Sequence, residues 1–412
     1  MKNKFVLLLA LLFVASVARP EVDTTDRIVL SEITKSGNNE VVPVTPGSGD
    51  TYSFTVSLEG SDTYYTAFEI DLTFPEGMSV AYNNKGTARV SMVKPSFYPY
   101  TVEEEEDEEG EMKEVKNYSH TLSVAMVSSN CLKVIVMSMQ NEEFTKTSGD
   151  LFKVHVKASP YLKPGNNGIG VSAKLVTKDE KMHTPTEYTS NTLTVANTSS
   201  MTLAVSSANQ FGTCILPFDY TLPVDGSLKA YTCNQCTSEE LLLTEVQGKM
   251  EAYTPYILYS PSGFSANIGG EVDANKYPEG GIVKQGYLVG TVVQKELKES
   301  TSYVMQNQGY GAMFYNVGDT PFVLSAGKCY AELPDGSEVR VIRMDDAILP
   351  FRKSAGMASA PVRPVSSSRV KTHSRGPCLM SVARRMAISM AQPIPSSAPR
   401  VVPLAFIHSP ST

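Results

Sequence analysis

Alternating apolar and polar side chains mark the clearest element of the sequence. From Phe68 to Tyr82 the chain reads FEIDLTFPEGMSVAY, in which a large apolar residue takes every second place as far as Phe74. A turn signal follows at Pro75 and Gly77. A period of two that ends at a turn predicts a β-strand with one buried and one solvated face. We expect this strand to lie inside a sheet, with its apolar residues in the core.

Short segments with the same period follow one another between residues 24 and 198, and they show no helical period. They are VVPV, TYSFTVSL, HTLSVAMV, CLKVIVMS, LFKVHVKA, GIGVSAKLV and NTLTVAN. Residues 200–345 form a second strand-rich region, with segments such as GTCILPFDYTLPVDGSLKAYTC and PFVLSAGKCYAELP. Many short strands separated by turns are typical of sandwiches and barrels. The predicted fold class is therefore all-β: a β-sandwich at 24–198, then a second β-sandwich or barrel at 200–345.

An acidic insertion, TVEEEEDEEGEMKEV from Thr101 to Val115, interrupts the first region. Like charges in a block repel one another and cannot pack, so we expect a solvated loop. Calcium prefers several converging oxygen ligands, but consecutive carboxylates do not converge on one point. The sequence predicts no cofactor and no metal ion.

The first residues carry an export signal. Lys2 and Lys4 precede an apolar run, and Ser16 and Ala18 supply the small residues of a cleavage site, so residues 1–18 are expected to be a signal peptide. No later segment is apolar for the roughly 20 residues that a spanning helix needs. We expect an exported protein at the cell surface or outside the cell, or in the periplasm if a C-terminal attachment segment is lost.

Charge is distributed unevenly. The net charge is -7, but residues 347–412 hold nine Lys and Arg and no Asp or Glu, whereas residues 1–346 hold all 43 acids against 27 bases. An acidic folded part argues against binding to nucleic acid. Residues 347–412 are rich in Ser, Ala, Pro and Arg and are expected to form a disordered basic tail.

The first region resembles the cohesin and carbohydrate-binding-module group of β-sandwiches. The resemblance rests on VVPVTPGSGDTYSFTVSLEGSDTYYTAFEIDLTFPEGMSVA and on GDLFKVHVKA, and it covers about Val41 to Val195. It implies a non-catalytic module that binds either a polysaccharide or a surface protein. The acidic insertion departs from the pattern of the group.

The second region is similar to an accessory β-domain of secreted proteins of the Bacteroidetes, through LKAYT, YTPYILYS and LSAGKCYAELP. Proteins of this kind often close with a short β segment used in secretion or attachment, and this chain lacks one at that place. Codon degeneracy permits PCLMSVARRMA, Pro377 to Ala387, to be an out-of-frame form of such a segment. A genuine basic tail and a frameshifted one both stay open.

Catalysis finds little support in the residues. A hydrolytic triad needs a base beside its nucleophile, and no Gly-x-Ser-x-Gly elbow is present. His120 and His155 lie in strand patterns, and His183 lies in the polar stretch KDEKMHTPTE, which we expect to be a loop. A glycosidase needs two carboxyl groups across a cleft, and nothing here resembles a hydrolase motif. The chain is predicted not to be an enzyme.

Four cysteines of the second region invite a metal hypothesis. Cys233 and Cys236 have CxxC spacing, and Cys214 and Cys329 are single. Four thiolates can close a zinc site, but such a site normally repeats the CxxC pair. Disulfides or buried thiols are the plainer expectation for an exported protein, and the pairing stays open.

Ligand recognition is the remaining use of such a sandwich. Sugar binding relies on exposed aromatic faces, and the candidate ligand-binding residues are Tyr64, Tyr65, Phe97, Tyr98 and Tyr100. Trp, a common sugar platform, is absent. A protein partner could instead dock on a flat polar sheet face, such as the one that includes Glu69, Asp71 and Thr73. We predict a secreted or cell-surface binding module with carbohydrate as ligand; the alternatives are protein docking and a structural spacer.

Overall fold

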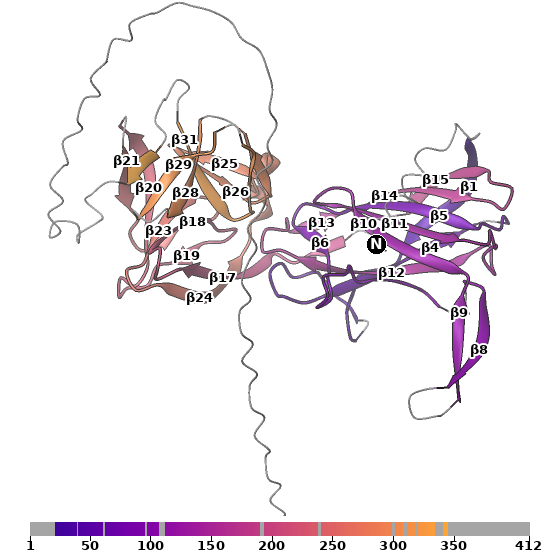
Figure 1. Ribbon diagram of the computed structural model, residues 1–412. Helices are drawn as coiled ribbons and strands as arrows, with labels where there is room; N and C mark the ends of the chain where they lie inside the picture. Colours follow the sequence, from indigo (N-terminus) through magenta and orange to yellow (C-terminus); the bar gives the residue numbers. More distant parts are fainter. Residues whose placement is uncertain are drawn as a thin grey trace, which may run out of the picture. The chain divides into compact units, whose positions relative to one another are not determined.

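The computed structural model describes residues 21–344, apart from 39, 61, 95–96, 107–111, 190–192, 238–239, 299–300, 308–310, 319 and 334–340. The predicted signal peptide and the basic tail lie outside the described residues. The described residues all belong to one compact unit, Met1–Arg352, and they form two sets of paired strands (Figure 1). We call β1–β16 the first lobe and β17–β32 the second lobe.

The strands of the first lobe are β1 (Glu21–Leu30), β2 (Thr34–Lys35), β3 (Glu40–Val41), β4 (Tyr52–Glu59), β5 (Ala67–Thr73), β6 (Met78–Val80), β7 (Val90–Met92), β8 (Tyr100–Glu106), β9 (Met112–Tyr118), β10 (His120–Met126), β11 (Cys131–Ser138), β12 (Gly149–Ala158), β13 (Gly165–Asn167), β14 (Gly170–Val176), β15 (Met182–Thr189) and β16 (Leu193–Val195).

The second lobe contains β17 (Thr198–Val205), β18 (Phe211–Ile215), β19 (Tyr220–Thr221), β20 (Lys229–Cys236), β21 (Glu240–Glu245), β22 (Lys249–Met250), β23 (Pro255–Tyr259), β24 (Phe264–Glu271), β25 (Ile282–Gln285), β26 (Leu288–Thr291), β27 (Lys295–Leu297), β28 (Ser302–Asn307), β29 (Ala312–Asn316), β30 (Phe322–Leu324), β31 (Lys328–Glu332) and β32 (Val341–Met344). Two short 3-10 turns, η1 (Ala274–Lys276) and η2 (Glu279–Gly281), precede β25. The all-β prediction is confirmed.

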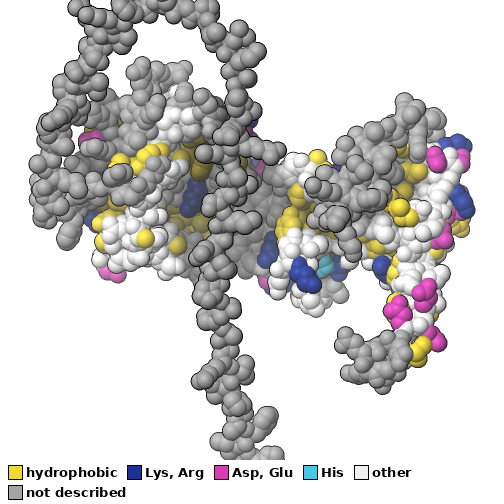
Figure 2. Space-filling model, viewed as in Figure 1, with side chains coloured by type: hydrophobic (Ala, Val, Ile, Leu, Met, Phe, Trp, Pro, Cys, Tyr) yellow, Lys and Arg dark blue, Asp and Glu magenta, His cyan; other side chains and the backbone are white. Residues whose placement is uncertain are grey.

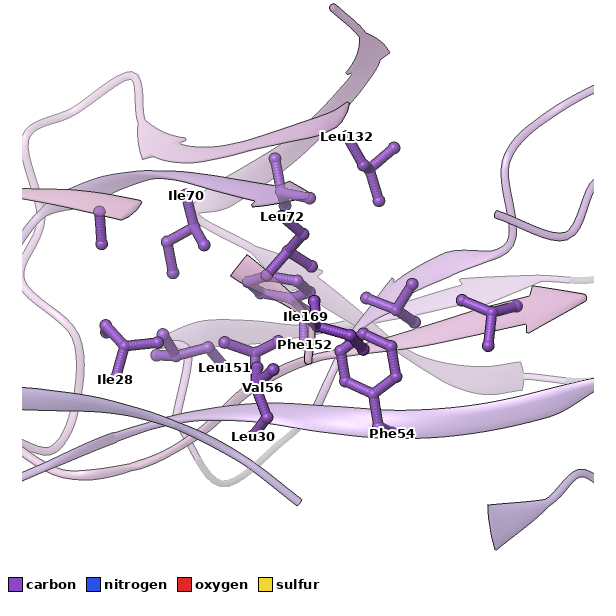
Figure 3. Close-up of a cluster of buried hydrophobic side chains, with 14 of the residues drawn as sticks. Ile28, Leu30, Phe54, Val56, Ile70, Leu72, Leu132, Leu151, Phe152 and Ile169 are labelled. Atoms are coloured by element: carbon purple, nitrogen blue, oxygen red, sulfur yellow. The ribbon is translucent and has the colours of Figure 1, made fainter. Parts of the chain in front are cut away.

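The main sheet of the first lobe is folded over on itself to make a sandwich. Its strands follow the order β10-β11-β5-β14-β15-β1-β4-β12-β6. Side chains of β4, β5, β11 and β12 meet between the two halves of this order and form one continuous core (Figure 3). Ile70 and Leu72 from β5 face Phe54 and Val56 from β4 across it.

Strand β5 has the alternation that the sequence predicts. Phe68, Ile70, Leu72 and Phe74 are at most 1% exposed. β5 pairs with β11 on one side and with β14 on the other, so it is an inner strand as expected. Burial of these four large apolar side chains fixes which face of β5 points into the core, because a shift of the strand register by one residue would expose all four.

Strand β1 joins the two halves of the sandwich. It pairs in parallel with β15 and antiparallel with β4. The register with β15 shifts between Thr24 and Arg27, at the level of the buried Asp26. The phenol of Tyr65 donates a hydrogen bond to Asp26 and also lies 3.4 Å from Nδ1 of His183 on β15. Because His183 lies within β15, the expectation of a loop at this position is wrong.

The described parts of the acidic insertion, 101–106 and 112–115, are the paired strands of a β-ribbon, so the expectation of a loop is wrong for them. Strands β8 and β9 pair antiparallel from Tyr100–Tyr118 to Glu106–Met112, and they project from the first lobe (Figure 1). Acidic side chains lie along the ribbon (Figure 2), and those of Glu103, Glu104 and Glu105 are exposed as predicted. Hydrogen bonding between two extended segments needs no buried side chains, so a block of like charge does not prevent it.

The second lobe is built on a ten-stranded sheet with the order β18-β23-β20-β21-β32-β29-β28-β31-β26-β25. Its apolar side chains form separate clusters: Leu216, Phe218 and Leu258 belong to one, and Tyr303 and Phe314 belong to another. Strands β18 and β25 lie at the two ends of the order. Among the described residues, no helix is long and apolar enough to cross a membrane.

Tyr65→Phe tests the hydrogen bond that holds Asp26. The change keeps the ring but removes the phenol donor, so a buried carboxylate loses a partner and the free energy of unfolding should fall by about 1–3 kcal/mol. Tyr64→Phe is the matched control, because Tyr64 is 48% exposed and its change should cost less than about 0.5 kcal/mol. Urea unfolding measures both variants, and equal stabilities would contradict this role of Tyr65.

Candidate functional site

The outward positions of β10, β11, β5 and β14 lie on one side of four adjacent strands, which we call the four-strand face, and Ile135, Ala67 and Val176 among them are buried. The registers place Ser123, Ile135, Glu69 and Lys174 in one row across the strands, and Ala125, Lys133, Asp71 and Ser172 in the next. The other outward positions of the paired segments are Thr121, Cys131, Met137, Ala67, Thr73, Gly170 and Val176. None of these side chains is aromatic, and Ala125, Ser172 and Thr73 are small and exposed.

An ion triplet lies at the centre of the four-strand face. The ammonium of Lys133 hydrogen-bonds the carboxylate of Glu69 and lies 3.1 Å from Oδ1 of Asp71. The three side chains are only 15–29% exposed. They are held between two neighbouring strands, so their positions are set by the sheet and not by flexible loops.

The pKa of Lys133 shows which effect wins in this triplet. Burial alone disfavours the ammonium, but hydrogen bonds to Glu69 and Asp71 and the attraction of their charges outweigh it, so the pKa of Lys133 is raised above its ordinary value. Lys133 is therefore charged at neutral pH. Glu69 and Asp71 stood out in the sequence but Lys133 did not, because the two carboxylates that pair with it lie more than 60 residues away along the chain.

The five predicted ligand-binding residues separate into buried and exposed rings. Tyr65, Phe97 and Tyr98 are at most 1% exposed, so none of the three can stack on a sugar as the structure stands. Tyr98 packs against Phe97 and donates a hydrogen bond to the carbonyl of Leu151. Tyr64 and Tyr100 are 48% and 39% exposed. Only these two rings keep a surface that a ligand can reach.

Tyr100 lies at the base of the ribbon and has neighbours of its own. Its ring contacts that of Tyr118 at a centroid distance of 5.3 Å, and the ammonium of Lys116 lies 4.7 Å from its centroid. Lys94 covers the ring of Tyr118 in the same way at 3.9 Å. A cation over a ring is stabilising, but it occupies one face of that ring.

Phe97 and Tyr98 belong to an aromatic cluster that includes a histidine. Phe144 contacts Phe68, Phe97, Tyr98 and His120 at centroid distances of 4.7–5.9 Å. Nε2 of His120 is 3.1 Å from the carbonyl oxygen of Thr66. Phe144 lies in no alternating segment, so the sequence pattern gave no sign of this cluster.

The cysteines of the second lobe do not gather at one point. Cys214 and Cys329 belong to one buried cluster, whereas Cys233 belongs to another, against which Cys236 packs. Burial raises the pKa of Cys214 and of Cys233 to about 12 each, so both are thiols at neutral pH. Among the described residues, no group of three or more His, Cys, Asp or Glu could hold a metal ion. A zinc site built from all four thiols does not fit this arrangement.

The buried His120 predicts a specific dependence of stability on pH. Desolvation lowers the pKa of His120 below its ordinary value of 6.5 in the folded state, even though the hydrogen bond to Thr66 opposes the shift. Below about pH 6.5 the unfolded chain therefore binds a proton that the folded chain resists, and stability should fall.

The His120→Asn variant should lose less stability than the wild type between about pH 7.5 and about pH 5, as measured by urea unfolding at both values. Phe144→Leu is the control, because it disturbs the same cluster without removing a titrating group. Its effect should be the same at both pH values. An unchanged pH dependence in His120→Asn would show that His120 does not cause it.

Comparisons with known proteins add no family assignment. No family model matches the sequence, and no curated protein matches it.

Solved structures that resemble the chain include cohesin modules. One is the cohesin module of a Clostridium perfringens family 33 glycoside hydrolase, with 15% identity, 40% of this chain and 95% of that module covered, and a TM-score of 0.27. A non-cellulosomal cohesin from the archaeon Archaeoglobus fulgidus has 12% identity, coverage of 42% and 92%, and a TM-score of 0.26. The seventh ScaB type I cohesin of Pseudobacteroides cellulosolvens has 10% identity, coverage of 43% and 94%, and a TM-score of 0.25. Such low TM-scores carry no argument about ligand or partner, and the β-sandwich assignment rests on the strand pairing itself.

Proposed function

We propose that this chain is an exported, non-catalytic binding module that docks a partner protein on the four-strand face. The observation that carries the proposal is the ion triplet of Lys133, Glu69 and Asp71, held by two strands at the centre of a sheet face whose outward positions hold no aromatic residue. A sheet face with fixed charges suits another folded protein, whereas sugar binding usually relies on a ring to stack on or on a cleft.

The charges of this face would set specificity more than affinity. Glu69 and Asp71 are fixed beside Lys133, and Lys174 lies next to Glu69 in the same row. A partner whose charges are complementary to this pattern binds more favourably. A partner that places like charges opposite these residues loses several kcal/mol of binding free energy. Around the triplet, the small side chains of Ala125 and Ser172 leave room for larger side chains of the partner.

The setting of the proposal comes from the sequence. The signal peptide predicted at residues 1–18 would export the chain to the cell surface or beyond. Residues 24–198 would be the docking domain, and residues 200–345 would be an accessory domain of the kind found in secreted proteins of the Bacteroidetes.

Ser172→Tyr tests the docking face. Ser172 is exposed beside Asp71, so a tyrosine there should leave the fold intact and place a bulky side chain where the partner would lie. In a pull-down of surface proteins with the full chain, we expect the affinity for the partner to fall at least about tenfold in this variant. A tenfold change corresponds to about 1.4 kcal/mol of binding free energy.

Ser79→Tyr is the matched control, since Ser79 is exposed on β6, in the other half of the folded-over sheet. It should retain the partner. A protein partner that is captured equally by both variants, or lost from both, would place docking away from the four-strand face.

Carbohydrate is the second candidate ligand, and the exposed rings of Tyr64 and Tyr100 favour it. Retention of polysaccharide on the full chain should then fall in Tyr64→Ala or Tyr100→Ala and persist in Tyr82→Ala, whose ring is 51% exposed but was not a predicted site. Affinity electrophoresis in polysaccharide gels measures this retention. If no polysaccharide retards the wild type, the carbohydrate proposal fails and protein docking is unaffected.

A further inference from the structure

A groove of about 290 Å³ lies in the second lobe, and none of its lining residues belongs to the four-strand face. Strands β18, β28, β30 and β31 line it. The groove lies where β28 and β31 stop pairing with each other. The two strands pair only at Ser302–Glu332 and Tyr303–Ala331, although β28 continues beside β29 as far as Asn307. Beyond Tyr303, the ladder described for β28 is the one with β29.

Strand β18 borders the groove with an outer edge along which the described strands form no ladder. It is the end strand of its sheet and pairs only with β23. The amide of Ile215 donates to Gly327, which shows that odd-numbered residues of β18 point their backbone groups away from β23. Because these groups alternate along an antiparallel strand, the N–H and C=O groups of Phe211 and Thr213 lie on the same outer edge.

Thr213 keeps this edge from pairing with β31. Its hydroxyl donates to the carbonyl of Cys329 and accepts from the amide of the same residue, both at 3.1 Å. The hydroxyl thus takes up the backbone groups of Cys329 that could otherwise bond to the backbone of β18. The side chains of Asn209 and Asn307 meet at 3.2 Å between the start of β18 and the end of β28. These contacts hold the groove in shape without filling it.

The groove is lined by both apolar and polar side chains. Leu324 is buried, whereas Phe322 and Val323 on β30 are 36% and 52% exposed at its rim. The polar lining includes Gln306 from β28 and the exposed Lys328 from β31, for which no ion pair is found among the described residues.

We propose that this groove binds an extended acidic peptide segment of a partner protein, which pairs with the outer edge of β18. Backbone groups at strand spacing recognise a peptide main chain, and side-chain pockets beside them select its sequence. The apolar rim would take a β-branched or aromatic side chain of the peptide, and Lys328 would take a carboxylate. The site is separate from the four-strand face and does not depend on the function proposed for it.

A library of linear dodecapeptides displayed on phage, panned against the full chain, supplies the probe. We expect the enriched peptides to carry Asp or Glu next to a β-branched or aromatic residue. Synthetic copies should bind Lys328→Glu at least about tenfold more weakly, which corresponds to about 1.4 kcal/mol. They should bind Lys276→Glu normally, because Lys276 is exposed and lies outside the groove.

Hydrogen exchange measured by mass spectrometry shows where the peptide binds. The amides of residues 209–215 should exchange more slowly with the peptide bound, and Ser172→Tyr should leave this protection unchanged. Protection elsewhere, equal binding to wild type and Lys328→Glu, or failure to enrich any peptide would overturn the proposal. Protection of 209–215 by neutral oligosaccharides alone would overturn it too, in favour of a sugar site.

Discussion

The first lobe depends on a single strand, β1, that hydrogen-bonds to both halves of the folded-over sheet. One of its edges pairs with β15 and the other with β4, so the two halves can enclose a core only if β1 is fixed along both. The register shift at the level of Asp26 is the point at which this arrangement is irregular. A buried carboxylate must be hydrogen-bonded, and the phenol of Tyr65 meets that need from just before β5. The same bond therefore links the joint between the halves to the entry of the central strand.

With its inner face committed to the core, β5 has only its outer face left for recognition. The inner side chains cannot change register without exposing Phe68 and Leu72, so the outer side chains Glu69 and Asp71 are held in register by the core beneath them. Lys133 is positioned in the same way by the inner residues of β11. The ion triplet is thus pre-organised by packing on the opposite side of the strands, which lowers the ordering cost of binding a partner.

Strands that bury one face could be predicted from the sequence. Strands that are held mainly by pairing with distant segments could not. Alternation identified β4, β5, β10, β11, β12 and β14. It could not identify β15, MHTPTEYT, which carries few large apolar residues and is held by ladders to β14 and β1. The burial of Tyr65 and Tyr98, two of the candidate ligand-binding residues, could not be predicted for a related reason. A tyrosine in a polar stretch suits a binding loop or a buried hydrogen bond equally well, and the choice depends on distant acceptors, here Asp26 and the carbonyl of Leu151.

The two candidate sites use different parts of a sheet. In the first lobe, the central strand β5 of the four-strand face has strands on both sides, so the candidate site there is a sheet face. In the second lobe, β18 is kept from pairing by the hydroxyl of Thr213, so backbone groups remain along a groove. An open edge invites aggregation, and proteins normally cover or charge it. Here Lys328 lines the groove beside the edge, and the Asn209–Asn307 contact lies between the start of β18 and the end of β28. An open edge beside a charged and partly apolar groove suits selective strand addition, because the side chains of the groove can discriminate among the peptides that the edge could pair with.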